Sequence, residues 1–228
     1  MTAQLVFGTG SARCGSKSLA VLFSAQDGVG ITHEEFLLPW DVDLDGLHRA
    51  IGACANKPQR QVITQGDPVR WLQYAVPKAT IVGDISPVYA SYASTLIEQY
   101  GARVVCMQRD KDGTVDSFLR QRSDHCSLHP ATGEEPDHAQ TIPKFDVPTR
   151  KEAAEAYWDF FYAKCEVLQG LYPESFRIWP IQALNHDDGQ NEILAFAGVT
   201  EPRNVTVDYR YTRYACRLFG GDGGNHAA

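Results

Sequence analysis

Long apolar runs are missing from this chain of 228 residues, and so is any excess of positive charge. No stretch approaches the roughly 18 consecutive apolar residues that a membrane helix needs, so we expect no membrane span. The net charge of −7 argues against general binding to nucleic acid, which requires a basic surface. A small anionic ligand stays compatible with this charge, because a helix terminus and a few local cations can bind it.

A secretion signal and a dense cysteine framework are missing too. Residues 1–4 carry no basic region, and the apolar run around them is too short for a signal peptide. The six cysteines are dispersed along the chain, which favours reduced, mostly buried thiols over disulfides. We therefore expect a cytoplasmic protein. With 43% hydrophobic and 21% charged residues, the composition is that of a globular chain, and the length fits one domain over residues 1–228.

Short apolar runs alternate with amphipathic segments along the chain. Strands are expected at Gln4–Phe7, Gly30–Leu38, Gln61–Thr64, Thr80–Val82, Arg103–Met107 and Phe176–Ile181. Helices are expected from about Gly15, at Asp43–Cys54, from Pro87, and at Asp112–Arg122, Thr149–Gly170 and Asn191–Ala197. This alternation predicts an α/β fold with three layers, in which helices flank a mostly parallel central sheet.

Two segments have no such pattern. Residues 123–148 are rich in proline and polar residues, and we interpret them as a flexible lid or a substrate-contacting loop. Within them, His125, Cys126 and His129 could suggest zinc, but no second ligand pair accompanies them, so no metal is expected. Residues 220–228 are expected to form a frayed tail.

The segment Gly8–Ser18 connects the first expected strand to the first expected helix. Its glycines allow the backbone to turn closely around a ligand, and the helix start offers unpaired N–H donors to an anion. Arg13 and Lys17 add positive charge, while Ser16 and Ser18 add hydroxyl donors. The alternative is a tight turn without a ligand, but so many donors at one helix start favour an anion site.

The segment differs from the nucleotide P-loop by one residue. In the pattern G-x-x-x-x-G-K-[ST], lysine directly follows the second glycine. Here Gly10 and Gly15 have the correct separation, but Ser16 stands before Lys17. On a helix, one inserted residue turns the lysine by about 100°. This argues against a nucleoside-triphosphate site, although Asp84, after an apolar run, resembles the Walker B aspartate and keeps that alternative open.

The same segment resembles the 5′-phosphosulfate loop of the sulfotransferases, commonly G-[TS]-x-R-[SC]-G-[TS]-[TS]-[ST]-L after a strand. Arg13-Cys14-Gly15-Ser16 and Ser18-Leu19 match this pattern, whereas Lys17 stands where a small hydroxyl residue is usual. The resemblance implies a P-loop-like sulfotransferase architecture and the donor 3′-phosphoadenosine 5′-phosphosulfate (PAPS). The donor-binding residues that it implies in this loop are Arg13, Cys14, Gly15, Ser16, Lys17 and Ser18.

A second segment strengthens the resemblance. Sulfotransferases bind the 3′-phosphate of the donor with an arginine at the end of a strand and a serine eight residues later. Arg109 and Ser117 have that spacing, although Lys111 stands where proline is frequent. The planar guanidinium of arginine suits bidentate binding of phosphate. The alternative is a solvated helix start capped by Asp110 or Asp112.

Gly83–Tyr89 is similar to the family's G-[DE]-x-[ST]-P-x-Y segment, which could shape the acceptor side or simply begin a helix. Sulfuryl transfer resembles phosphoryl transfer, so catalysis should come from positioning and electrostatic stabilisation without a metal. We expect Arg13 to stabilise the transferring group and the bridging oxygen. The resemblance places a general base after the second strand, where Glu35 and Glu34 are the first candidates and His33 the third.

The sequence therefore predicts an enzyme that transfers a sulfuryl group from PAPS to a hydroxyl or amine. The acceptor could be a small molecule or a glycan, and neither it nor the oligomeric state follows from the motifs. The alternatives are a nucleotide or small-molecule kinase with a degenerate P-loop, and a non-catalytic nucleotide-binding relative.

Overall fold

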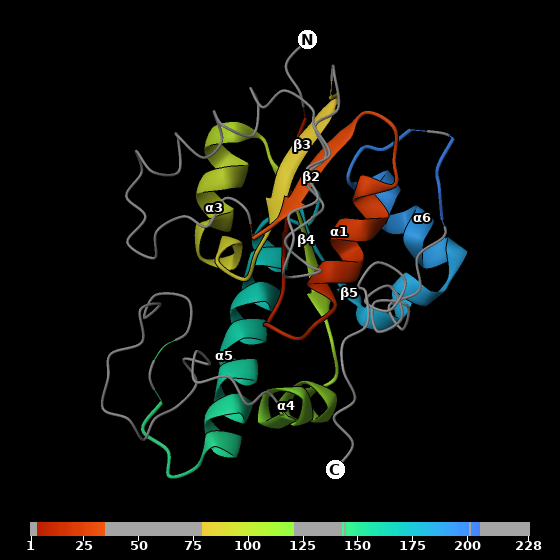
Figure 1. The fold of residues 1–228 in the computed structure, drawn as a ribbon. Helices are drawn as coiled ribbons and strands as arrows, with labels where there is room; N and C mark the ends of the chain where they lie inside the picture. Colours follow the sequence, from red (N-terminus) through yellow and green to blue (C-terminus); the bar gives the residue numbers. More distant parts are fainter. Residues whose placement is uncertain (1–3, 35–78, 121–142, 144, 201, 206–228) are drawn as a thin grey trace, which may run out of the picture.

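A computed structural model describes residues 4–34, 79–120, 143, 145–200 and 202–205. Along the chain, its elements are β1 (Gln4–Thr9), α1 (Ser16–Ser24), β2 (Val29–His33), β3 (Ile81–Ile85), α3 (Tyr89–Tyr100), β4 (Arg103–Gln108), α4 (Lys111–Arg120), α5 (Arg150–Leu171), β5 (Phe176–Pro180), the 3₁₀ helix η2 (Ile181–Asn185) and α6 (Asp187–Phe196) (Figure 1). Strands and helices alternate through most of these ranges, as the sequence predicts.

The described strands form one sheet in the order β2-β3-β1-β4-β5, and every pair in it is parallel. The prediction of an α/β fold around a parallel sheet is therefore confirmed. Strand β1 lies at the centre, between β3 and β4. Because all strands run the same way, the loops that follow β1, β3 and β4 leave the sheet at one edge, in the lower half of Figure 1.

The two faces of the sheet carry different helices, which gives the three layers. Successive side chains of a strand point to opposite faces, and β4 shows this directly. Its Val105 and Met107 pack with α1 and α6, whereas Val104 and Cys106 pack with α3, α4 and α5. A separate cluster that includes Phe7 and Tyr89 fixes the start of α3 against β1. Apolar side chains thus cover both faces of the sheet.

Helix α5, the longest described helix, is held at its start by a capping box. The Thr149 side chain accepts a hydrogen bond from the backbone N–H of Glu152, and the Glu152 carboxylate accepts one from the backbone of Thr149. Its buried residues face the sheet and α4. Neither α5 nor another helix in the described ranges is both long and apolar enough to cross a membrane.

Several predicted boundaries differ from the structure. Helix α3 begins at Tyr89 rather than Pro87, and α6 begins at Asp187, one turn before the predicted Asn191. The first turn of α6 is polar, so it lacks the apolar periodicity on which the prediction depended. Asp187 and Asp188 in this turn instead stabilise the helix start, because their negative charge faces the positive end of the helix dipole. The predictions that lie outside the described residues are those for Asp43–Cys54, Gln61–Thr64, most of 123–148, and 220–228.

Candidate active site

The loop between β1 and α1 contains three residues with positive φ, the first of which is Gly10 at φ 151°. Gly15, with φ 93°, stands immediately before α1, and Arg13 has φ 70°, which is rare for a residue with a side chain. Gly15, the residue at the N-cap of α1, has no side chain with which to cap the helix. The first N–H groups of the helix therefore point out of its end without an intrahelical partner, as an anion site requires.

Two buried side chains attach this loop to the core of the protein. Cys14 is fully buried in the core beneath α1, and burial raises the pKa of its thiol to about 12. Ser18 is also buried, on the inner side of α1. Arg13 and Lys17 are exposed. In this conformation Cys14 and Ser18 support the loop, whereas a ligand could reach Arg13 and Lys17.

The second predicted half of the site lies at the end of the neighbouring strand, β4. Asp110 caps α4, because its carboxylate accepts a hydrogen bond from the backbone N–H of Gly113 at 2.6 Å. The Thr114 hydroxyl donates to the Asp110 carbonyl at 2.9 Å. The helix start is thus capped, as one interpretation of the sequence expects. Arg109, directly before the cap, keeps 26% of its side chain exposed and lies 4.0 Å from the Asp110 carboxylate.

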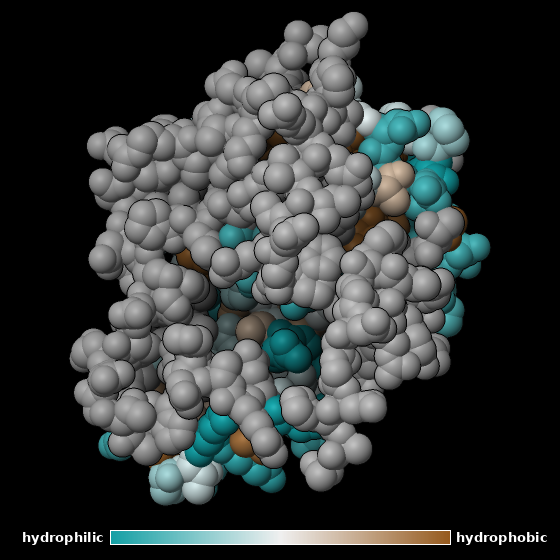
Figure 2. Space-filling model, viewed as in Figure 1, coloured by the Kyte–Doolittle hydropathy of each residue, from teal (hydrophilic) through white to brown (hydrophobic). Residues whose placement is uncertain are grey.

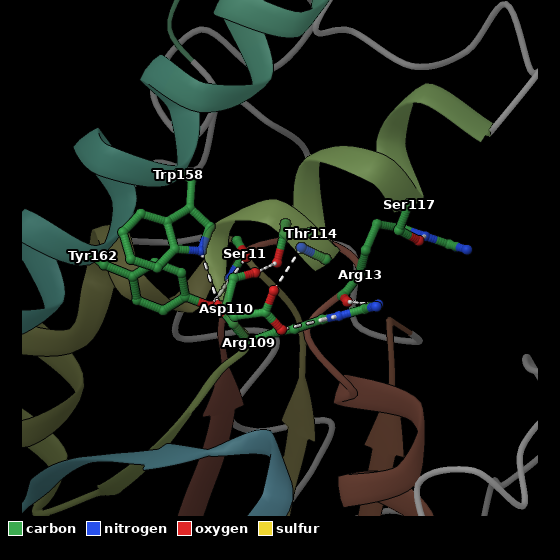
Figure 3. Close-up of polar contacts among 9 residues, drawn as sticks. Ser11, Arg13, Arg109, Asp110, Thr114, Ser117, Trp158 and Tyr162 are labelled. Carbon is green, nitrogen blue, oxygen red and sulfur yellow. Dashed lines mark hydrogen bonds and ion pairs between the residues drawn. The ribbon is translucent and has the colours of Figure 1, made fainter.

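The two halves meet (Figure 3). The Arg13 Nε donates a hydrogen bond to the Ser117 Oγ at 3.0 Å, and the Arg109 guanidinium approaches the Arg13 carbonyl oxygen at 3.5 Å. Ser117 is buried on the inner side of α4, with 7% of its surface exposed. Residues that are 104 positions apart in the sequence therefore contact each other. The predicted loop and the predicted Arg109/Ser117 pair therefore lie next to each other at the carboxyl edge of the sheet.

Of the predicted bases, His33 contacts the loop directly. Its Nε2 is 3.0 Å from the Ser16 Oγ, and its side chain is buried at the end of β2. Glu34 follows with a positive φ of 52° and an exposed side chain, and its carboxylate lies 3.9 Å from the His33 Nδ1. Glu35 lies outside the described residues. The structure thus brings His33 together with the loop after β1, and Glu34 lies beside His33.

Asp84, at the end of β3, is fully buried, and its carboxylate accepts hydrogen bonds from two hydroxyl groups. The Thr32 hydroxyl donates to one carboxylate oxygen at 2.6 Å, and the Tyr89 hydroxyl donates to the other at 2.9 Å. Asp84 therefore ties β2 and the start of α3 to β3. A Walker B aspartate would instead need its carboxylate available to a metal or its water, which these contacts do not favour.

Two residues that sequence reasoning missed support the site from α5. The Trp158 indole N–H donates to the Arg109 carbonyl at 3.0 Å. The Tyr162 hydroxyl donates to the Met107 carbonyl at 2.8 Å and lies 3.0 Å from the Ser11 Oγ. Burial raises the pKa of Tyr162, so its phenol stays protonated. The only sequence signal for this pair is its i, i+4 spacing, which predicts a shared helix face but not what that face contacts.

Hydrophilic side chains of the described residues reach the surface at this edge of the sheet. Figure 2 shows them at its lower centre, in the region where Figure 1 places the start of α1 and α4. Among the residues that the structure describes, no three His, Cys, Asp or Glu side chains lie close enough to hold a metal ion. The candidate zinc residues His125, Cys126 and His129 lie outside those residues.

No protein-family model matches the chain, and no curated protein compared with it is similar in sequence.

Proposed function

We propose that this protein is a PAPS-dependent sulfotransferase that transfers a sulfuryl group to a hydroxyl or amine of a small-molecule or glycan acceptor. One observation carries the proposal: the Arg13 side chain contacts Ser117, and Arg109 reaches the Arg13 backbone. The two motifs resemble the 5′-phosphosulfate and 3′-phosphate sites of the same donor. Their contact places the two motifs close together, as simultaneous binding of both groups by one nucleotide requires. A cytoplasmic setting is part of this proposal.

The proposed donor would lie across the carboxyl ends of β1 and β4, the usual ligand edge of such sheets. Its 5′-phosphosulfate would bind the N–H groups at the start of α1, together with the Ser16 hydroxyl and the Lys17 ammonium. Its 3′-phosphate would bind Arg109 and the Ser117 hydroxyl. The guanidinium of Arg109 can hold two phosphate oxygens at once, which gives this half of the site its specificity for phosphate.

The proposed reaction is an in-line displacement at sulfur. The acceptor oxygen or nitrogen forms a bond to sulfur, while the bond from sulfur to the bridging oxygen breaks and its electron pair stays on the 5′-phosphate. Negative charge therefore grows on the bridging oxygen, and Arg13 would stabilise it once its guanidinium turns from Ser117, its hydrogen-bond partner in this structure, toward the 5′ side. The products are the sulfated acceptor and 3′,5′-adenosine bisphosphate.

The proton of the acceptor must pass to a base, and His33 is our first choice. It is buried beside the loop, whereas the Glu34 carboxylate is exposed. Its contact with Ser16 places the imidazole next to the proposed phosphate ligands. We expect His33→Ala to lose turnover while Glu34→Ala retains most of it. Full activity of the His33 variant, with loss in Glu34→Ala or Glu35→Ala, would transfer the role to the corresponding carboxylate.

The kinase alternative is less favoured for two reasons. Lys17 stands one residue later than the lysine of the nucleotide P-loop pattern, and the Asp84 carboxylate already accepts two hydrogen bonds.

Isothermal calorimetry with 3′,5′-adenosine bisphosphate, and separately with ATP and magnesium, distinguishes the two functions. We expect metal-independent binding of the bisphosphate. Arg109→Ala should weaken it by about 10- to 100-fold, the loss expected for hydrogen bonds to a charged group.

Arg177→Ala is the matched control, since this arginine lies midway along β5 with its guanidinium over the Trp179 ring. It removes the same charge without touching the proposed site, so bisphosphate affinity should not change. A preference of the wild-type protein for Mg-ATP would overturn the proposal. Bisphosphate binding without transfer of ³⁵S from labelled PAPS to a panel of phenol, amine and glycan acceptors would instead favour a non-catalytic relative.

A further inference from the structure

One face of α5 contacts both halves of the candidate site. Trp158 and Tyr162 are one helical turn apart, and their rings pack together with centroids 4.7 Å apart. Figure 3 shows the two rings side by side on α5, facing the loop after β1 and the end of β4. Neither side chain carries charge, and neither belongs to the two motifs.

The contacts of Tyr162 join the two halves directly. Its hydroxyl lies 3.0 Å from the Ser11 Oγ and 3.4 Å from the Ser11 backbone N, and it donates to the Met107 carbonyl at 2.8 Å. Ser11 is the second residue of the loop after β1, and Met107 lies near the end of β4. A single buried phenol thus sets the distance between the start of the loop and the neighbouring strand.

The contact of Trp158 holds the other half. Its indole N–H donates to the Arg109 carbonyl at 3.0 Å. Arg109 lies between the end of β4 and the cap residue of α4, Asp110. The Lys111 ammonium lies 6.0 Å from the indole ring and pairs with Asp159 on the same helix at 2.6 Å. Helix α5 therefore contacts the chain on both sides of the cap residue Asp110, through the Arg109 backbone before it and the Lys111 side chain after it.

We propose that Trp158 and Tyr162 are positioning residues, which set the separation of the two phosphate-binding halves and thereby the selectivity for a nucleotide with a 3′-phosphate. This inference rests on the proposed function. Tyr162 acts on the loop through Ser11, and Trp158 acts through the Arg109 backbone. Precise placement matters because a directional hydrogen bond between guanidinium and phosphate weakens steeply when its geometry is lost.

The two residues should have different effects on two probes. The probe 5′-AMP carries only the 5′-phosphate, whereas 3′,5′-adenosine bisphosphate carries both. Trp158→Phe keeps an aromatic ring but removes the N–H that holds Arg109. It should weaken bisphosphate binding by about tenfold, the effect of losing one well-aligned contact, and leave 5′-AMP binding unchanged.

Tyr162→Phe removes only the hydroxyl that holds Ser11, so it should weaken both probes. The control is Tyr172→Phe, at the C-terminal end of the same helix, where the phenol donates to Glu98 away from the site. It should change neither affinity. A variant that is merely less stable should bind both probes more weakly. Loss of bisphosphate binding alone in Trp158→Phe would therefore indicate a positioning role rather than a structural one.

Hydrogen–deuterium exchange on the ligand-free protein gives a readout that does not depend on the donor. Amides of residues 10–15 should exchange faster in Tyr162→Phe than in wild type or Tyr172→Phe. Unchanged exchange, or equal loss of both probes in Trp158→Phe, would overturn the inference. If wild type binds no bisphosphate while the exchange still rises, the proposed donor is wrong but the contribution of Tyr162 to loop position stands.

Discussion

Replacing Arg13 by glycine and by alanine separates the cost of its backbone conformation from the loss of its side chain. Arg13 has φ 70° and its Nε donates to Ser117 at 3.0 Å. Both variants lose that hydrogen bond, so in the folded state they differ in how well each residue tolerates the left-handed backbone. A left-handed conformation costs alanine about 1–2 kcal/mol, whereas glycine adopts it freely.

Glycine also makes the unfolded chain more flexible, which offsets about 0.4–1 kcal/mol of that advantage. The glycine variant should therefore be more stable than the alanine variant by about 0.5–1 kcal/mol. For a chain of this length, that corresponds to about 1–4 °C in melting temperature. Urea denaturation followed by circular dichroism measures the difference in the free energy of unfolding.

The same pair of variants links this conformation to function. Both should lose sulfuryl transfer, because neither has a guanidinium, even though one of them has an unstrained loop. A residue can keep a strained backbone where the surrounding structure requires that conformation, and such residues are common at active sites. An alanine variant that is as stable as the glycine variant, or more stable, would refute the argument that Arg13 occupies a strained backbone.

Two further predictions concern stability and reactivity. Gly83→Ala should cost several kcal/mol or prevent folding, because the new Cβ would lie 1.6 Å from the Val6 carbonyl oxygen across the β1–β3 pair. Gly101→Ala, whose Cβ meets nothing within 4 Å at φ 63°, should cost only about 1 kcal/mol, and similar urea midpoints for the two would contradict this reasoning. Since burial raises the pKa of Cys14 to about 12, its thiol stays protonated in the folded protein at pH about 7–9, and iodoacetamide should modify it only in denaturant. Peptide mapping by mass spectrometry checks this, and rapid modification of Cys14 in the folded protein would show that the loop opens.

Much of the fold could be predicted because its signals are local. The apolar run at Arg103–Met107 and the amphipathic segments around it require only near neighbours to be recognised, and β4 has nearly the predicted bounds. Boundaries fail where local signals are weak: α6 begins a turn before its apolar residues, because acidic residues stabilise its start.

The parts of the candidate site that depend on motifs could also be predicted. Parallel strands bring their carboxyl ends to one edge, so a loop after β1 and a loop after β4 had to lie on the same side of the sheet. Which bases approach the loop could not be predicted. The packing of α1 against β2 places His33 against Ser16, whereas alternation along a strand says only that neighbouring residues face opposite ways.

By itself, the sequence determined the α/β class, the glycine-containing loop with its two cations, and the spacing of Arg109 from Ser117. These features depend on residues that are close together in the chain, whose geometry follows from backbone periodicity and turn preference. Only the tertiary structure decided that Arg13 meets Ser117, and that Tyr162, 151 positions from Ser11, joins the loop to β4. Such contacts arise from the order of the strands and the docking of α5, which are set by the packing of the whole core rather than by any local pattern.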